Sequence, residues 1–217
     1  MDTPVIDVSA LFGLRVRTAR LELRLPSEDE MVALAVLADR GVHPPDRMPF
    51  RHPWTDRTGQ ELVDGTVAYH RGARDEWRVE RWALPLAVFT NGETIGCIEM
   101  RGDGFQAGRS FETGSWLGGE HQGRGYGTEM RVAVLALGFD GLGALVAFSG
   151  AFDWNTASLR VSEKLGYRPT GETNEHAPRG TTEREIVMEL EREEWERRVH
   201  PPVEIDGLER CLHLFGL

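Results

Sequence analysis

The sequence is poor in cysteine and lacks the features of a secreted or membrane protein. Its 217 residues include only two cysteines, Cys97 and Cys211. Two cysteines are too few for a disulfide framework and indicate a reducing compartment. No basic segment precedes an apolar run at the N-terminus, and no apolar stretch approaches the length of a membrane span. We therefore expect a cytoplasmic protein that does not contact a membrane.

An excess of positive charge is also missing. Lysine and arginine total 25 residues against 35 aspartates and glutamates, which gives a net charge of −10. Such a surface repels a phosphate backbone, so nucleic acid is not expected as a partner. A cationic acceptor, such as an amine, is compatible with this charge. The seven histidines show no metal-ligand spacing with one another or with cysteine, so no metal is expected.

What the chain does contain is the ordinary composition of a globular protein, with 40% hydrophobic and 28% charged residues. Its length fits one domain with an appendage. Period-two and helical apolar patterns, with turn residues between them, predict its elements. These are strands at 21–25, 84–89, 94–100, 110–117, 144–148, 167–172 and 184–190, and helices over 27–38, from 56 or 58 towards 82, over 128–139 and over 155–165, with a loop over 43–53 and a turn over 102–108.

The most informative segment is a glycine-rich turn from Gln122 to Gly127, between a predicted strand and an apolar-striped helix. A turn of this kind presents free backbone N–H groups at a helix N-terminus, where the helix dipole also favours negative charge. Glycine lets the backbone adopt left-handed angles and approach a ligand closely. Arg124 adds a charge suited to a diphosphate. The turn therefore predicts a ligand that carries phosphates.

Other glycine-rich loops fit this segment less well. A nucleotide-hydrolysing P-loop ends in Gly-Lys-Ser/Thr, whereas this turn ends in Gly127-Thr128-Glu129. A dinucleotide fingerprint needs a third glycine, but its position is Thr128 when counted from Gly123 and Met130 when counted from Gly125. A nucleotide-binding oxidoreductase is accordingly disfavoured. A plain structural turn without a ligand remains the alternative.

The pattern of Gln122, Gly125 and Gly127 resembles the acetyl-coenzyme A pyrophosphate loop of the GNAT N-acyltransferase superfamily. Further motifs over residues 15–190 resemble its Rim-type branch, whose founders acetylate ribosomal-protein N-termini. The stretches 45–54 and 116–130 resemble actinobacterial members, some of which transfer succinyl groups. The Rim-like motifs are Thr18-Ala19-Arg20-Leu21-Glu22-Leu23-Arg24, then Glu112-x-Gly114-x-Trp116-Leu117, then Asn155-x-x-Ser158 followed by Lys164-Leu165-Gly166-Tyr167.

This resemblance implies an α+β fold with a mixed, mostly antiparallel sheet of about six or seven strands and about four flanking helices. It also implies acetyl-CoA or succinyl-CoA as co-substrate. The backbone N–H of Leu117, with that of Gly118, is implied to hold the thioester oxyanion. The residues implied to bind the cofactor are Trp116, Leu117, Gly118, Gln122, Gly123, Arg124, Gly125, Tyr126, Gly127, Thr128, Asn155 and Ser158.

The resemblance assigns the remaining chemistry to two side chains. Glu112 matches the acidic position of the strand motif and is the candidate base for the amine proton, with an exposed strand glutamate as the alternative. Many relatives protonate the leaving thiolate with a tyrosine, but that position here is Ser162. Ser158, one turn from Asn155, is therefore the candidate to contact the coenzyme sulfur. Asn155 is also a plausible helix N-cap, and Ser158 a plausible exposed serine.

Acceptor recognition is expected in the long loop that contains Phe50, Arg51, His52 and Trp54, because specificity usually resides in such loops. Packing at the surface explains Arg51, His52 and Trp54 equally well. We expect acetyl transfer to a primary amine by direct attack in a ternary complex. Succinyl transfer, or coenzyme A binding without turnover, is the alternative.

The last predicted unit is an appendage at 191–217, after an acyltransferase domain at 15–190. Several of its residues are too apolar for a solvated terminus. The tail must therefore pack on its own domain or on a second copy, and a two-fold homodimer is the arrangement that we expect. The apolar residues are Val203, Ile205, Leu208, Cys211, Leu212, Leu214 and Phe215.

Overall fold

Nine strands and six α-helices make up residues 6–217, the part of the chain that the computed structural model describes. Residues 1–5, which bear on the predicted lack of a leader, lie outside it. The strands are β1 (Arg15–Arg17), β2 (Glu22–Arg24), β3 (Arg81–Thr90), β4 (Glu93–Asp103), β5 (Ser110–Leu117), β6 (Val146–Phe152), β7 (Arg168–Thr173), β8 (Glu185–Glu191) and β9 (Glu204–Asp206). The helices are α1 (Glu28–Asp39), α2 (Gly59–Asp75), α3 (Phe105–Gly108), α4 (Tyr126–Ala136), α5 (Thr156–Leu165) and α6 (Arg192–Glu196).

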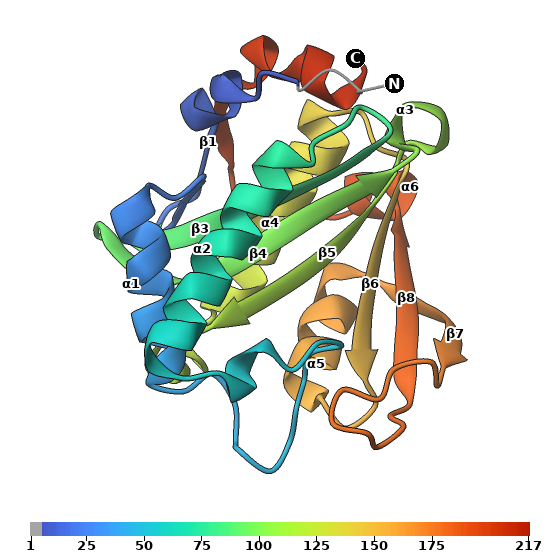
Figure 1. Cartoon of the computed structure of the whole chain (residues 1–217). Helices are drawn as coiled ribbons and strands as arrows, with labels where there is room; N and C mark the ends of the chain where they lie inside the picture. The colour runs from blue at the N-terminus through green and yellow to red at the C-terminus, as the bar shows by residue number, and fades with distance from the viewer. Residues whose placement is uncertain (1–5) are drawn as a thin grey trace, which may run out of the picture.

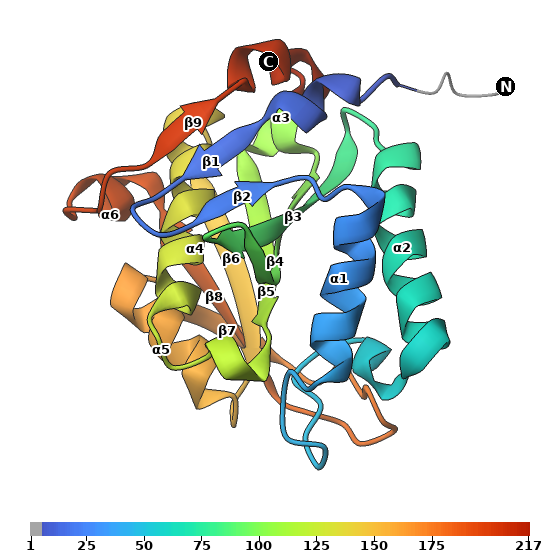
Figure 2. The same cartoon turned by 90° about the vertical axis from the view of Figure 1, so that its left-hand side faces the viewer.

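All nine strands join one sheet in the order β7-β8-β6-β5-β4-β3-β2-β1-β9. Only the central pair β5 and β6 is parallel, and the other neighbours are antiparallel. Helices α1 and α2 cover one face of the sheet, which we call the outer face, while α4 and α5 cover the inner face (Figures 1 and 2). The predicted mixed, mostly antiparallel fold is confirmed. The sheet exceeds six or seven strands because the short strands β1 and β9 extend one edge.

The sheet forks between its two parallel strands. Their ladder runs from the pair Ser110 and Val146 to the pair Thr113 and Ser149, and stops there. Beyond this point β5 continues to Leu117 along β4, and β6 continues to Phe152 along β8. The two strands therefore diverge. Beyond Thr113, the backbone groups of β5 that point towards β6 have no strand partner. We call this opening the fork, and the pair Thr113–Ser149 its apex.

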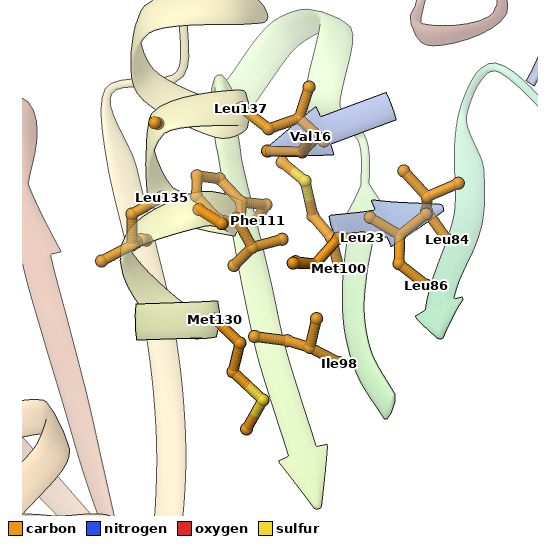
Figure 3. Packing of buried hydrophobic residues seen from close by; sticks show 14 of the residues in the cluster. Val16, Leu23, Leu84, Leu86, Ile98, Met100, Phe111, Met130, Leu135 and Leu137 are labelled. Carbon is orange, nitrogen blue, oxygen red and sulfur yellow. The ribbon is translucent and has the colours of Figure 1, made fainter. Parts of the chain in front are cut away.

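The main core lies between the sheet and α4. Residues 130–137 are all buried, and Figure 3 shows Met130 near Ile98 of β4 and Leu137 near Val16 of β1. Gly138 lets the chain approach the sheet here, because a Cβ at this position would collide with the ring of Phe111. Tight packing of this kind fixes the helix on the sheet and so holds its N-terminus in place.

Helix α1 begins where the sequence predicts it. Ser27 caps it and forms a capping box with Glu30, whose carboxylate also binds Arg24 at 2.7 Å. Helix α2 is shorter than predicted, since it ends at Asp75 instead of continuing towards Trp82. A tight turn between Arg78 and Arg81 follows it and starts β3.

The tail packs on its own chain. Its strand β9 pairs with β1, and Phe215 is fully buried with its ring centroid 4.9 Å from that of Trp82. The indole N–H of Trp77 donates to the carbonyl of Leu214 at 2.9 Å. These contacts account for the apolar tail within one chain. The homodimer stays a prediction, and the tail no longer argues for it.

No helix within residues 6–217 is both long enough and apolar enough to cross a bilayer.

Candidate active site

The predicted phosphate loop forms an uncapped helix N-terminus. Gly123 and Gly125 have φ values of 72° and 82°, a region that glycine adopts without strain. Gly125 is the N-cap of α4, and no side chain caps the helix. The first helical hydrogen bond runs from Glu129 N–H to the Gly125 carbonyl at 3.1 Å. The N–H groups of residues 126–128 therefore point out of the helix end, as a phosphate site requires.

Gln122 braces this loop instead of projecting from it. Its amide donates to the carbonyl of Leu117 at 2.9 Å and to that of Val42 at 2.7 Å. One side chain thus joins the end of β5, the start of the loop and the segment that follows α1. The glutamine of the motif is explained by this bracing role.

Arg20 belongs to the same site although the sequence analysis did not select it. Its guanidinium donates to the carboxylate of Glu129 at 2.6 Å and to the Arg124 carbonyl at 3.1 Å, and lies over the ring of Tyr126. A Cβ on Gly125 would stand 3.3 Å from it. The loop therefore carries two arginines, Arg20 and Arg124. No local signal links Arg20 to it, because the two segments lie more than 100 residues apart.

The backbone of β5 offers donors to the fork. The N–H of Gly118 is already bonded to the Ile95 carbonyl at 3.0 Å, so it is not free for an oxyanion. Successive N–H groups along a strand point to opposite sides. Those of Leu117 and Ser115 consequently point away from β4 and into the fork. The structure thus leaves the predicted donor Leu117 available and adds Ser115, which lies closer to the apex.

The start of α5 faces the same region. Asn155 caps this helix, since its side-chain oxygen accepts from the N–H of Ser158 at 3.3 Å. Ser158 is half-buried in the first turn. Ser162, in place of the usual tyrosine, is fully buried and its hydroxyl has no hydrogen-bond partner among residues 6–217. The capping role of Asn155 does not exclude contact with a ligand.

On the outer face, the predicted base and a predicted acceptor residue form an ion-paired group. Arg51 contacts Glu112 at 2.9 Å and the buried Glu185 at 2.7 Å. We call Arg51, Glu112 and Glu185 the outer cluster. Burial acts to lower the pKa of Arg51, but the hydrogen bond to Glu185 and the charges of both carboxylates outweigh it and raise this pKa. Glu185 was not predicted, and the pairing joins positions 134 residues apart.

A second charged pair adjoins the outer cluster. Glu112 lies opposite Arg101 on β4, and Arg101 is bonded to the buried Glu99. His176 lies 3.3 Å from Glu185 on the other side. Glu112 therefore lies on the outer face beside two cationic side chains, those of Arg51 and Arg101.

The aromatic residues of the long loop pack inward. Phe50 contacts Trp54, and Trp54 contacts Trp116 of β5 with ring centroids 5.3 Å apart. His52 is exposed. Phe50 and Trp54 therefore fix the loop against the strand that carries Glu112.

A second loop, residues 174–184, closes over the first. Arg179 donates to Asp56 at 3.0 Å and to the Pro45 carbonyl at 2.7 Å. A cavity of about 470 Å³ lies between the loops, on the outer side of the site. It is lined by Asp46, Arg47, Met48, Trp154, Pro178, Arg179, Thr181 and Glu183.

Solved structures share this fold. RimJ of Mycobacterium smegmatis in complex with CoA-disulfide has a TM-score of 0.67 at 21% identity, covering 93% of this chain and 92% of that one. RimL, a ribosomal L7/L12 alpha-N-protein acetyltransferase in complex with coenzyme A, has a TM-score of 0.67 at 16% identity, with 80% and 95% covered. The microcin C7 self-immunity acetyltransferase MccE, in complex with acetyl-CoA and AMP, has a TM-score of 0.64 at 14% identity, with 80% and 93% covered.

The sequence itself matches a family model over residues 20–168, described as the acetyltransferase (GNAT) domain. This span contains the phosphate loop, the fork and the start of α5. The Rim-type likeness of the sequence agrees with the structures of RimL and RimJ. The chain belongs to the GNAT acetyltransferase family and is a coenzyme A-dependent N-acyltransferase.

Proposed function

We propose that the chain transfers an acyl group directly from acyl-coenzyme A to a primary amine, with the pyrophosphate at the N-terminus of α4 and the thioester in the fork. The observation that carries this is the pairing of an uncapped, glycine-led helix start with strand amides that point into an opening of the sheet. The amine nitrogen attacks the thioester carbonyl carbon, the C–S bond breaks, and the thiolate leaves with the electron pair.

Each step has a candidate group in the chain. The N–H of Leu117, with that of Ser115, would stabilise the oxyanion, because preorganised donors act most strongly on developing charge. Glu112 would take the amine proton, directly or through water, on the outer face. Ser158 would hydrogen-bond the departing sulfur. Phe50, Arg51, His52 and Trp54 would shape the acceptor side.

The donor is proposed to be acetyl-CoA, with succinyl-CoA as the alternative. The acceptor is a small-molecule or protein amine, and ribosomal-protein amines are one candidate because RimL is described as acting on such a protein. We keep a homodimer and a cytoplasmic setting, without nucleic acid or membrane as partner, as parts of this proposal.

The phosphate loop is tested by replacing Gly125 with Val. The positive φ disfavours the new side chain, whose Cβ would also approach Arg20. We expect the dissociation constant for coenzyme A to rise at least tenfold, about 1.4 kcal/mol, by isothermal titration calorimetry. Gly143→Val is the matched control, because Gly143 has a φ of 70° in a turn outside the loop. Equal affinity in both folded variants refutes the phosphate site.

Turnover is tested with acetyl-CoA and a panel of amines, by following free thiol. Ser158→Ala should lower kcat more than it raises KM, because contact with the sulfur strengthens as charge develops. Thr156→Ala, an exposed change in the same helix turn, is the control. Binding of coenzyme A without thiol release from any acyl-CoA would instead indicate a binding module.

A further inference from the structure

Directly beneath the fork, on the inner face, lies a buried cation without an anion. Arg131 of α4 is 3% exposed, and its guanidinium donates to the hydroxyl of Ser149 at 3.0 Å. Among residues 6–217 no carboxylate lies within ion-pair distance of it, and its Nε has no hydrogen-bond partner. A guanidinium cannot discharge by losing its proton. Its burial is therefore unfavourable until an anion arrives.

Hydroxyl groups surround this cation. Thr113 and Ser149 form the apex of the fork and are both buried. The ring centroid of Tyr167 lies 5.9 Å from the guanidinium carbon, and the hydroxyls of Tyr167 and Ser162 are buried without partners in the described chain. Burial raises the pKa of Tyr167, although the charge of Arg131 opposes this, so the phenol remains a proton donor. We call Arg131, Thr113, Ser149 and Tyr167 the inner cluster.

The position of the inner cluster selects the anion. The Ser115 and Leu117 amides lie two and four residues from the apex, or about 7 and 13 Å along the strand. An acyl chain of four to six carbons whose carbonyl binds at the Ser115 amide extends towards the apex, whereas the Leu117 amide lies too far from the apex for a chain of this length. A carboxylate at its end would meet a guanidinium and several hydroxyl donors, which is a favourable set for a carboxylate.

We propose that the inner cluster recognises a terminal carboxylate on the acyl group, so that the donor is a dicarboxylic acyl-coenzyme A of four to six carbons. This inference rests on the proposed function, since it assumes the thioester in the fork. It favours the alternative donor, succinyl-CoA or a near homologue, over acetyl-CoA, on grounds independent of the acceptor. The carboxylate supplies the anion that the buried Arg131 lacks.

The test compares binding of charged and uncharged acyl groups of equal length by calorimetry. We expect succinyl- or glutaryl-CoA to bind at least tenfold more tightly than butyryl- or valeryl-CoA. Arg131→Met should abolish this ratio and leave the affinity for free coenzyme A unchanged. Arg131→Lys should retain part of the ratio, because it keeps the charge and loses the planar fork.

Thermal unfolding of the ligand-free protein gives a second readout. Removing an unpaired buried charge should stabilise the fold, so Arg131→Met should raise the melting temperature by about 3 °C or more. Absence of any preference in the wild-type protein, or a preference that survives Arg131→Met, overturns the inference. A uniform loss of turnover with every donor, at unchanged binding ratios, would assign Arg131 to the departing thiolate instead. Failure to bind coenzyme A at all would refute the proposed function as well.

Discussion

The outer and inner clusters lie back to back at the same fork, yet their charges are balanced differently. Glu112 and Thr113 are neighbours on β5, so their side chains project to opposite faces. On the outer face Arg51 meets two carboxylates. On the inner face Arg131 meets hydroxyls only. In the outer cluster every charge has an oppositely charged partner in the free protein. In the inner cluster Arg131 gains such a partner only when an anion binds from outside the described chain.

Breaking the outer cluster should have the largest effect. Arg51→Ala leaves Glu185, which is 3% exposed, with His176 as its remaining partner. Removing one member of a buried pair strands the other charge, so the free energy of unfolding should fall by about 3 kcal/mol in urea titrations. Combining it with Glu185→Gln should restore much of this loss, because the stranded charge is gone. A double variant as unstable as the single one would contradict this account.

His70 offers a comparison with Arg131, because it is a buried basic side chain that can lose its proton and become neutral. It lies in α2 with an unpartnered Nδ1, and burial lowers its pKa to about 4 from 6.5. The unfolded state therefore binds the proton more readily. The stabilisation is complete above pH 6.5 and is lost as the pH falls towards 4.

We expect up to about 3 kcal/mol of acid-dependent loss across this window, measured by urea unfolding at several pH values. His70→Gln should flatten the dependence, whereas His52→Gln, at an exposed position, should leave it intact. A wild-type slope that persists in His70→Gln would assign the titration to another group.

Glu112 should give the smallest effect, because it is half-exposed and Arg51 keeps Glu185 as its partner when the charge of Glu112 is removed. Glu112→Gln keeps a hydrogen-bonding group opposite Arg51 and removes the base. Turnover should fall about tenfold near pH 6, where free amine is scarce, and less near pH 9. Unchanged rates across this range would leave Glu112 with a purely structural ion pair.

The main-chain part of this site could be predicted from the sequence because it is local. The strand at 110–117 and the loop at 122–127 are each specified by neighbouring residues, including the glycines that form the turn. The predicted strand has the bounds of β5. The second helix was extended too far because its end depends on a turn that leads into β3. The additional strand β9 depends on pairing with β1, far away in the sequence.

The charge partners could not be predicted for a related reason. Arg51 and Glu185 are 134 residues apart, and Arg20 reaches a loop more than 100 residues away. Arg131 is a lone arginine in an apolar-striped helix, where sequence patterns indicate a solvated position. Only the packing of α4 on the sheet shows that it faces inward.

The pairing of β9 with β1 also bears on how the chain folds during synthesis. Strand β1 is made near the beginning and its partner β9 near the end, so one edge of β1 stays unpaired while nearly all of the protein is translated. Unpaired strand edges invite association with other chains. Nascent molecules on neighbouring ribosomes are therefore exposed to mispairing at β1 until residues 204–206 emerge and pair with it.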